Sequence, residues 1–463
     1  MDYYLLIDFG STYTKLTAVD IEKEEIAATA KAITSIESNI MDGFNAAMAV
    51  IDEKLGGQAH YIKKLACSSA AGGLKMVAIG LVPDLTAEAA KRAALGAGAR
   101  VIKTYSYNLS SDEIKEIDGM NPDIILLAGG TDGGNKDTII FNAGMLAAST
   151  IRKPIIVAGN KSARDEIRQL LDQTDIEYYI ADNVMPRLNV LEVDPAREAI
   201  RKVFMSRIIQ AKGMGEAQNF ISGILMPTPQ AVLKAAEALS KGSDAEDGIG
   251  DLIIVDIGGA TTDIHSMCVG APTKAGVTFR GLEEPFAKRT VEGDLGMRYS
   301  ALSLFEAAST KEIKRYLTYK DQDIEGECRR RSKDIRLLPE TDLEKDFDQA
   351  MAKIATDHSM SRHAGVVEAV YSPMGMMYSQ EGKDLLEVGY MIGTGGVLVH
   401  SETPKEILAA GCYRLDEVNS LKPQHPKFML DKSYILSAMG LLAEEDKDMA
   451  VRIMKKYIVE IEA

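Results

Sequence analysis

The stretch DIGGATTD, residues 256–263, follows an apolar run at 252–255 and indicates the fold of this chain. Hydroxyl groups and bare glycine amides suit phosphate oxygens, because both donate hydrogen bonds at close range. Carboxylates repel phosphate, so an acid at either end of the stretch is unfavourable by itself. A Mg²⁺ ion between acid and phosphate removes this conflict, directly or through its water. The stretch therefore predicts a strand that ends in a phosphate-binding turn.

A related stretch opens the chain. Asp8-Phe-Gly-Ser-Thr-Tyr-Thr-Lys15 lies across two expected strands, at 3–9 and 15–19. Two similar strand–turn–strand units half a chain apart indicate an internal duplication, with two similar domains that face one cleft. We expect the first domain, with an insertion, at residues 1–245 and the second at 246–463.

Strands and helices alternate through the rest of the chain, which predicts α/β sheets covered by helices. A helix with prolines at its entrance is expected at 227–239, before a polar, glycine-rich linker at 241–250. Residues 300–365 are rich in charge and in helical spacing, and are expected to form a helical insertion in the second domain. A third glycine turn, at 392–397, follows an expected strand at 388–391.

Composition excludes several classes of protein. The chain has 463 residues, 46% hydrophobic and 26% charged, which is typical of a globular protein with more than one domain. Its net charge of −15 disfavours a nucleic-acid surface, because phosphate binding needs a basic face. The four cysteines show no CxxC spacing, so neither a zinc site nor a disulfide framework is expected. Scattered cysteines without a disulfide framework fit the reducing cytoplasm, so we expect a cytoplasmic location. No membrane span or secretory leader is expected.

The two turns suggest a site for phosphoryl transfer. Asp8 and Asp256 are expected to hold Mg²⁺, and Lys15 to neutralise phosphate charge. Such a reaction needs little beyond positioning and electrostatic stabilisation. The simpler alternative is that each acid only caps a strand end, since one glycine hairpin by itself is weak evidence. The repetition of the pattern, in order and with a third turn, favours the functional interpretation.

These motifs resemble the actin, hexokinase and Hsp70 ATPases. The stretches at 8–15 and 256–263 are similar to their two phosphate loops, and the turn at 392–396 is similar to their adenosine loop. Glu292-Gly-Asp-Leu-Gly296 resembles the glycine turn that leads Hsp70 into its second insertion. The resemblance implies an α/β fold of two duplicated ribonuclease H-like (actin-like ATPase) domains that flank a nucleotide cleft, with inserted subdomains. It also implies ATP and Mg²⁺ as cofactors. The expected nucleotide contacts are Gly10, Ser11, Thr12, Lys15, Gly258, Gly259, Ala260, Thr261, Gly293, Gly393, Thr394, Gly395 and Gly396.

The segment Pro229-Gln-Ala-Val-Leu233 lies just before the second domain, where this superfamily has its first connecting helix. Gln230 in this segment is similar to the actin glutamine that positions the attacking water. Asp263 and Asp132 are alternative polar groups for the γ-phosphate, and each of them could instead cap a turn. The assignment of the water-positioning group among these three residues stays open.

Within this superfamily the chain resembles the glutamate mutase L-protein (MutL/GlmL) family. The resemblance rests on DFGSTYTK at 8–15, ACSSAAGGLKMVAIGLVPDLTAEAAKRAALGAGA at 66–99 and PDIILLAGGTDGGN at 122–135, and runs over nearly the full length. It implies an adenosylcobalamin-dependent mutase or aminomutase as partner, and an ATP-driven chaperone that reactivates it.

Two other functions remain open. A small-molecule kinase of the same superfamily needs a carboxylate as base for the acceptor hydroxyl, and Asp132 could serve. An actin-like filament or scaffold is the second, because the amphipathic stretch 449–458 is similar to a membrane anchor, although a packed terminal helix is the preferred interpretation.

Two further patterns are given their simpler interpretations. Asp263-Ile-His265-Ser-Met-Cys268 nearly matches the Asp-x-His-x-x-Gly of cobalamin ligation, but the final glycine is absent, so no cobalt ligand is expected. The methionines of 374–377 are expected to pack in a core rather than to bind a partner.

Overall fold

The computed structural model describes residues 1–10, 13–34, 40–57, 59–69, 74–209, 224–372 and 375–462. The chain forms two compact units, Met1–Val232 and Leu233–Ala463. Their boundary lies inside helix α8 (Thr228–Lys241). The expected functional division at 245/246 stays a prediction.

The first unit begins with a mixed sheet of five strands in the order β10-β4-β1-β2-β3. Its first three strands form an antiparallel meander, and β4 and β10 join β1 in parallel. Helix α1 (Ile40–Lys54) buries Phe44, Ala47 and Ile51 at helical spacing, and Phe44 packs near Phe9 of β1. The strands are β1 (Asp2–Phe9), β2 (Tyr13–Asp20), β3 (Glu25–Ile33), β4 (His60–Ser68) and β10 (Ile224–Pro227).

The second unit repeats this arrangement, with the strand order β14-β12-β11-β17-β18-β19. Strands β11, β12 and β14 form the meander, and β17 and β18 follow β11 in parallel. The strands are β11 (Leu252–Ile257), β12 (Thr262–Met267), β14 (Ala287–Glu292), β17 (Tyr390–Thr394), β18 (Lys427–Leu430) and the short antiparallel edge strand β19 (Val459–Glu460).

Counted within each sheet, the first five strands have the order 3-2-1-4-5 of the ribonuclease H-like fold, and β19 adds a sixth strand at the edge of the second sheet. The fold is therefore α/β with two duplicated ribonuclease H-like domains, as in actin-like ATPases, and the predicted fold class is confirmed. In such sheets ligands bind at the carboxyl ends of the parallel strands. In the first unit these are the ends of β1, β4 and β10, and in the second those of β11, β17 and β18.

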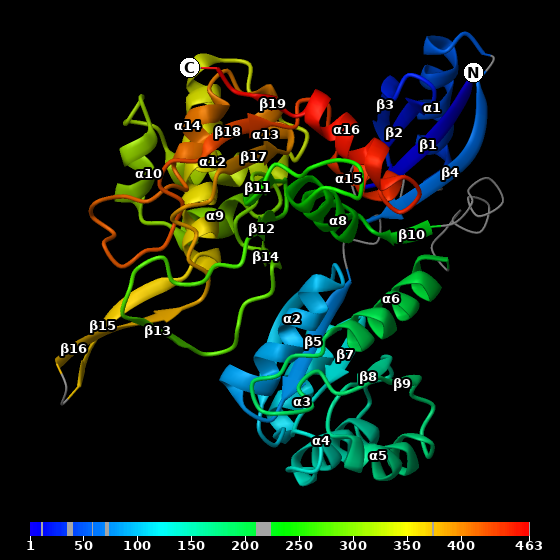
Figure 1. Ribbon diagram of the computed structural model, residues 1–463, viewed down its shortest axis with the longest axis vertical. Coiled ribbons are helices and arrows are strands. Elements are labelled where there is room, and N and C mark those ends of the chain that lie inside the picture. The colour runs from blue at the N-terminus through cyan, green and yellow to red at the C-terminus, as the bar shows by residue number, and fades with distance from the viewer. Residues whose placement is uncertain are drawn as a thin grey trace. The chain divides into compact units, whose positions relative to one another are not determined.

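A second α/β sheet is inserted between β4 and β10. Its five parallel strands have the order β6-β5-β7-β8-β9, which corresponds to 2-1-3-4-5 of doubly wound folds. Helices α2 and α6 cover one face, and α3, α4 and α5 cover the other (Figure 1). The capping box of Ser110 and Glu113 fixes the start of α3. The elements are β5 (Lys75–Gly80), the π-turn η1 (Pro83–Ala87), α2 (Glu88–Gly96), β6 (Arg100–Ser106), α3 (Ser111–Met120), β7 (Ile124–Leu127), α4 (Asp137–Ala148), β8 (Ile155–Val157), η2 (Lys161–Ala163), α5 (Arg164–Leu171), β9 (Tyr178–Ile180) and α6 (Asp194–Ile209).

The helical insertion of the second unit lies between β14 and β15. Its longest helix, α12 (Asp342–His363), packs on β11, β12 and β14, where it buries Phe347, Met351 and Ile354. The other helices of the unit are α9 (Ala301–Ala307), α10 (Thr310–Tyr316), α11 (Ile324–Lys333), α13 (Gly396–His400), α14 (Pro404–Ala409), α15 (Leu436–Leu442) and α16 (Lys447–Tyr457).

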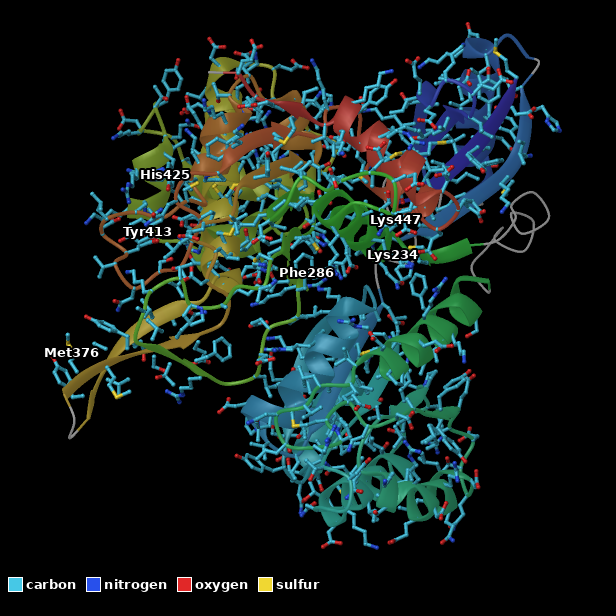
Figure 2. All side chains as sticks on the ribbon, in the orientation of Figure 1. Lys234, Phe286, Met376, Tyr413, His425 and Lys447 are labelled. Atoms are coloured by element: carbon cyan, nitrogen blue, oxygen red, sulfur yellow. The ribbon has the colours of Figure 1, made fainter. Side chains whose placement is uncertain are left out.

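A three-stranded arm projects from the second unit (Figure 1). It consists of β13 (Val277–Arg280), β15 (Val366–Ser372) and β16 (Gly375–Glu381). Met376 and Met377 are exposed on it, and Figure 2 shows Met376 toward its end. The expectation that these methionines pack in a core is wrong, because the arm extends beyond the apolar cluster at its base, which contains Val367, Leu386 and Leu421. Met374 lies outside the described residues.

The terminal stretch 449–458 falls largely in α16, which packs against α15 and buries Met449, Val451, Ile453 and Met454. Within the described part of the chain, no helix is both long enough and apolar enough to cross a bilayer.

Candidate functional site

Asp8 lies at the carboxyl end of β1, and its side chain is only 6% exposed. Its Oδ1 accepts a hydrogen bond from the hydroxyl of Thr228 at 2.6 Å and a weaker one from the thiol of Cys67 at 3.6 Å. Burial raises the pKa of Cys67 well above its usual range, and the neighbouring Asp8 raises it further, so the thiol keeps its proton. A buried carboxylate held in this way has a fixed orientation.

The first turn follows directly. The amide of Gly10 donates to the carbonyl of Tyr13 at 3.1 Å, and a Cβ at this glycine would lie 2.5 Å from the same oxygen. Only glycine fits there. Lys15 pairs with Asp8 across the β1–β2 ladder, which places both residues at the base of the turn. Ser11 and Thr12, the predicted hydroxyl donors, lie outside the described residues.

The second turn repeats this geometry. The amide of Gly258 donates to the carbonyl of Thr261 at 2.9 Å, as Gly10 does to Tyr13. Asp256 pairs with Asp263 across the ladder, so Asp263 occupies the place that Lys15 has in the first turn. Its carboxylate accepts hydrogen bonds from Arg289 at 2.6 and 2.9 Å and from the hydroxyl of Thr261 at 3.0 Å. A carboxylate neutralised by a buried guanidinium suits an ordering role better than that of a base.

The segment that contains Gly293 supports the second turn from its carbonyl side. The amides of Met297 and Arg298 donate to the carbonyls of Gly258 and Gly259 at 3.0 and 2.8 Å. The Ser300 hydroxyl is bonded to the carbonyl oxygens of Ala260 and Gly293 at 2.7 and 2.9 Å. The turn is therefore held through its carbonyls and through the Gly258 amide, and the assignment of the Gly259 amide to a phosphate is consistent with the structure.

The third turn differs in part from the expectation. Gly393 and Thr394 still belong to β17, because their backbone pairs with Val255 and Asp256 of β11. Gly395, with φ +96°, makes the turn and Gly396 begins α13. A Cβ on Gly395 would lie 2.4 Å from the carbonyl oxygen of Ile257 and 3.0 Å from Oδ1 of Asp256. The second and third turns are thus in direct contact.

Two residues of the loop after β18 complete this end of the sheet. Asp431 is fully buried, accepts from the Thr394 hydroxyl at 3.3 Å and caps the start of α15 through the amides of Ile435 and Leu436. Burial, followed by the charges of Asp256 and Asp431, raises the pKa of Tyr434. The phenol therefore lies near Asp256 and stays protonated.

Gln230 lies in the first turn of α8, two residues after Thr228. Its Oε1 is buried and has no hydrogen-bond partner within the described residues. A buried acceptor left in this state costs about 1–3 kcal/mol. Such a cost is common at functional sites, where a ligand or water supplies the missing donor.

Asp132 belongs to the inserted sheet and lies after β7. Its Oδ1 accepts from the amide of Lys161 and from the side chain of Asn183, both at 3.0 Å. It therefore lies on a different sheet from Asp8 and Gln230 and ties together the loops after β7, β8 and β9. His265 lies inside β12 and is 1% exposed, and burial lowers its pKa to about 3.

Each of the two strand-end acids has the chemistry of a Mg²⁺ ligand. Asp8 and Asp256 each present a carboxylate at the end of a central strand, beside a glycine turn. The described residues contain no group of three or more His, Cys, Asp or Glu side chains arranged to hold a metal. Mg²⁺ is commonly bound by one or two carboxylates with water and substrate phosphates, and does not require such a group.

Sequence reasoning missed several residues that the fold brings to these turns: Cys67, Thr228, Arg298, Ser300, Asp431 and Tyr434. Thr228 carried a usable signal, because a hydroxyl residue before Pro229 is typical of a helix start. The others come from segments that are remote in sequence and have no local pattern.

A family model and a curated relative both match this chain over nearly its full length, and both carry the same family description. The family model described as "MutL protein" matches residues 4–458. A curated relative, "Protein MutL" of Clostridium tetanomorphum, is 63% identical over 462 residues and covers 100% of both chains.

Solved structures show much weaker likenesses. The activator of the 2-hydroxyisocaproyl-CoA dehydratase from Clostridium difficile with bound ADPNP is 10% identical, covers 100% of both chains and has a TM-score of 0.32. The ligand-bound xylulose kinase from Lactobacillus acidophilus is 10% identical, with 100% of this chain and 93% of the other covered and a TM-score of 0.36.

Proposed function

The chain belongs to the MutL protein family, and from this premise we propose that it binds ATP with Mg²⁺, hydrolyses the ATP and uses the cycle to reactivate a partner enzyme. The observation that carries the proposal is the repeated geometry of Asp8 and Asp256. Each acid ends the central strand of a ribonuclease H-like sheet, and each is followed by a turn closed by the same glycine hydrogen bond.

In this proposal the residues have separate roles. The amide of Gly259 donates to a phosphate oxygen, and Lys15 places a cation beside the phosphates. Gly10 and Gly258 close their turns with their own amides and leave no side chain between the turn and the phosphates. Asp8 and Asp256 hold Mg²⁺, which would neutralise phosphate charge as it develops. The amide of Gln230 orients the attacking water, and this interaction satisfies its buried Oε1. Gly293 is assigned to the nucleotide through the segment that supports the second turn.

The third turn is assigned to the adenosine. Gly395 and Gly396 leave no side chain where the backbone turns from β17 into α13, so a flat ligand could approach closely. Gly393 and Thr394 would act from inside β17 as the support of this turn. Asp263 is assigned to ordering Thr261, through the hydrogen bond between them.

The proposed partner is an adenosylcobalamin-dependent mutase or aminomutase in the cytoplasm. ATP hydrolysis would drive the exchange of damaged cobalamin for intact cofactor. The support for the partner is family membership, whereas the support for nucleotide chemistry is the site itself.

The test has two parts. Isothermal titration measures ATP binding, with and without Mg²⁺, and phosphate release measures hydrolysis. A mutase that holds inactivated cobalamin is then incubated with this chain, free adenosylcobalamin and either ATP or a non-hydrolysable analogue. We expect recovery of mutase activity with ATP only. Absence of ATP affinity would overturn the nucleotide assignment, and phosphorylation of an added polyol or acid would favour a kinase instead.

A further inference from the structure

Three neighbouring strands of the first sheet end at one point, and a side chain from each contributes to a small polar cluster. Asp8 ends β1, Cys67 lies opposite it near the end of β4, and Thr228 follows β10. The Thr228 hydroxyl lies 2.6 Å from Oδ1 of Asp8 and 3.6 Å from Sγ of Cys67. These contacts join segments that are far apart in the chain, since Thr228 and Asp8 are separated by 220 positions.

Thr228 has a second role, because it is also the first residue of α8. Pro229 follows it, and the fixed φ of proline limits the directions that the chain can take into the helix. Gln230 comes next, with its orphan Oε1. Gln230 therefore lies in the same helix turn as the residue that holds Asp8.

We propose that Thr228 is a positioning residue that fixes the metal-holding carboxylate of Asp8 relative to the water-positioning amide of Gln230. This inference rests on the proposed ATP hydrolysis. Its physical basis is that a carboxylate bonded at Oδ1 by a hydroxyl cannot rotate without losing a charge-assisted hydrogen bond. A rearrangement of Asp8 would thus be passed to the start of α8, and the reverse also holds.

The second unit has an equivalent set of side-chain contacts, made by different residue types. Thr394 lies opposite Asp256 on the neighbouring parallel strand, as Cys67 lies opposite Asp8. Its hydroxyl bonds to Asp431, which caps α15. In both units a polar side chain that follows the fifth strand contacts the neighbouring parallel strand, and it begins the next helix in the first unit and caps it in the second. The duplication therefore extends to the contacts between the fourth strand and the residue that follows the fifth strand.

Cys67 alone could not provide this restraint. A thiol is a weak donor, and its Sγ lies 3.6 Å from the carboxylate oxygen. The hydroxyl of Thr228 is closer by 1 Å, since it lies 2.6 Å from the carboxylate oxygen and the thiol lies 3.6 Å from it.

The experiment compares Thr228→Val, which keeps the shape and removes the donor, with Thr228→Ser, which keeps the donor. Thr14→Val is the matched control, because the buried Thr14 hydroxyl bonds to that of Thr34, and Thr14 lies opposite Phe9 on the β1–β2 ladder rather than opposite Asp8. For each variant we would measure kcat and KM for ATP hydrolysis, the Mg²⁺ concentration at half-maximal rate, and Tm.

We expect Thr228→Val to lower kcat at least tenfold and to raise the Mg²⁺ requirement severalfold, with KM for ATP little changed and Tm close to that of Thr14→Val. Thr228→Ser should recover most of the rate. A Thr228→Val rate within twofold of the wild type, or a Thr228→Ser variant as slow as Thr228→Val, would overturn the inference while ATP hydrolysis stands. A wild-type chain that does not hydrolyse ATP would overturn the proposed function, and this inference with it.

Discussion

Arg298 donates a hydrogen bond of 2.7 Å to Oδ2 of Asp348, and the backbone amide of the same arginine bonds to the carbonyl of Gly259. One residue thus joins the second glycine turn to helix α12 of the helical insertion. Arg331 of α11 completes the network with a 2.6 Å bond to the other oxygen of Asp348 and packs over the ring of Phe347. All the polar groups of this network are largely buried.

Replacing Asp348 by alanine should destabilise the protein strongly, because two guanidinium groups would lose the carboxylate between them. Loss of one partner from a buried pair typically costs about 3–5 kcal/mol. Glu325→Gln is the control, since Glu325 pairs with Arg329 on the exposed face of α11 and should cost at most about 1 kcal/mol. Urea unfolding measures both changes, and similar small losses in the two variants would contradict the role of Asp348.

Asp256→Asn should retain part of the nucleotide affinity, because the backbone amides of the turns are unchanged. Hydrolysis should fall by about 10²-fold or more, since charge stabilisation in the transition state is lost. Asp251→Asn is the control, at the other end of the same strand. Phosphate release and titration with ATP separate the two effects. Hydrolysis at the wild-type rate would show that Asp256 is only a strand cap.

Gly395→Ala should disrupt the contact between the second and third turns. Its Cβ would meet Ile257 and Asp256 at 3.0 Å or less, and its φ is +96°. Gly250 has a similar φ of +92° but open space around it, so Gly250→Ala reports the backbone strain alone. We expect ATP affinity to fall at least tenfold in Gly395→Ala and to stay unchanged in Gly250→Ala. Equal affinities in titration would argue against the adenosine assignment.

Gln230→Met should slow ATP hydrolysis while it raises stability by about 1 kcal/mol, because it removes a buried acceptor that has no partner in the described structure. Gln380 is the opposite case, since its side-chain amide donates to the carbonyls of Gly270 and Gly382. Gln380→Met should therefore lower stability. Denaturant midpoints and steady-state rates test this pair, and a less stable Gln230→Met variant would count against the functional role.

Lys383 should make stability depend on pH in the alkaline range. Its side chain is buried and donates to the carbonyl of Phe286 at 2.7 Å, and burial lowers its pKa from 10.5 to about 8. The titratable groups that face it are Cys268, Lys288, Glu284 and Asp251. Below pH 8 the lysine is charged in both states and the full burial cost applies. Between pH 8 and 10.5 the unfolded chain binds more protons, so stability rises with pH.

The matching measurement compares the wild type with Lys383→Met across this range. The free energy of unfolding of the wild type should rise relative to the variant by about 3 kcal/mol, from about 1.4 kcal/mol per pKa unit. A difference that does not change with pH would mean that the pKa of Lys383 is not lowered in the folded protein.

The local sequence determined the central parts of both domains. Apolar strands that end in an acid and a glycine turn produced β1 and β11, and the helix expected at 227–239 corresponds to α8, near its observed bounds. These elements could be predicted because their signals lie within a few residues. Strand β3 and the full inserted order 2-1-3-4-5 were not predicted, because β3 lacks a strong apolar pattern and strand order depends on pairing between distant segments.

What the sequence by itself determined was the duplication, the positions of Asp8 and Asp256, and the family to which the chain belongs. Only the tertiary structure decided that Thr228 reaches Asp8, that Asp263 is bound by Arg289, that Gly395 touches the second turn, and that Met376 is exposed. The physical reason is the distance along the chain over which each kind of interaction acts. Turn and strand preferences come from neighbouring residues, whereas the partner of a polar side chain depends on which remote segments the folded sheets bring together.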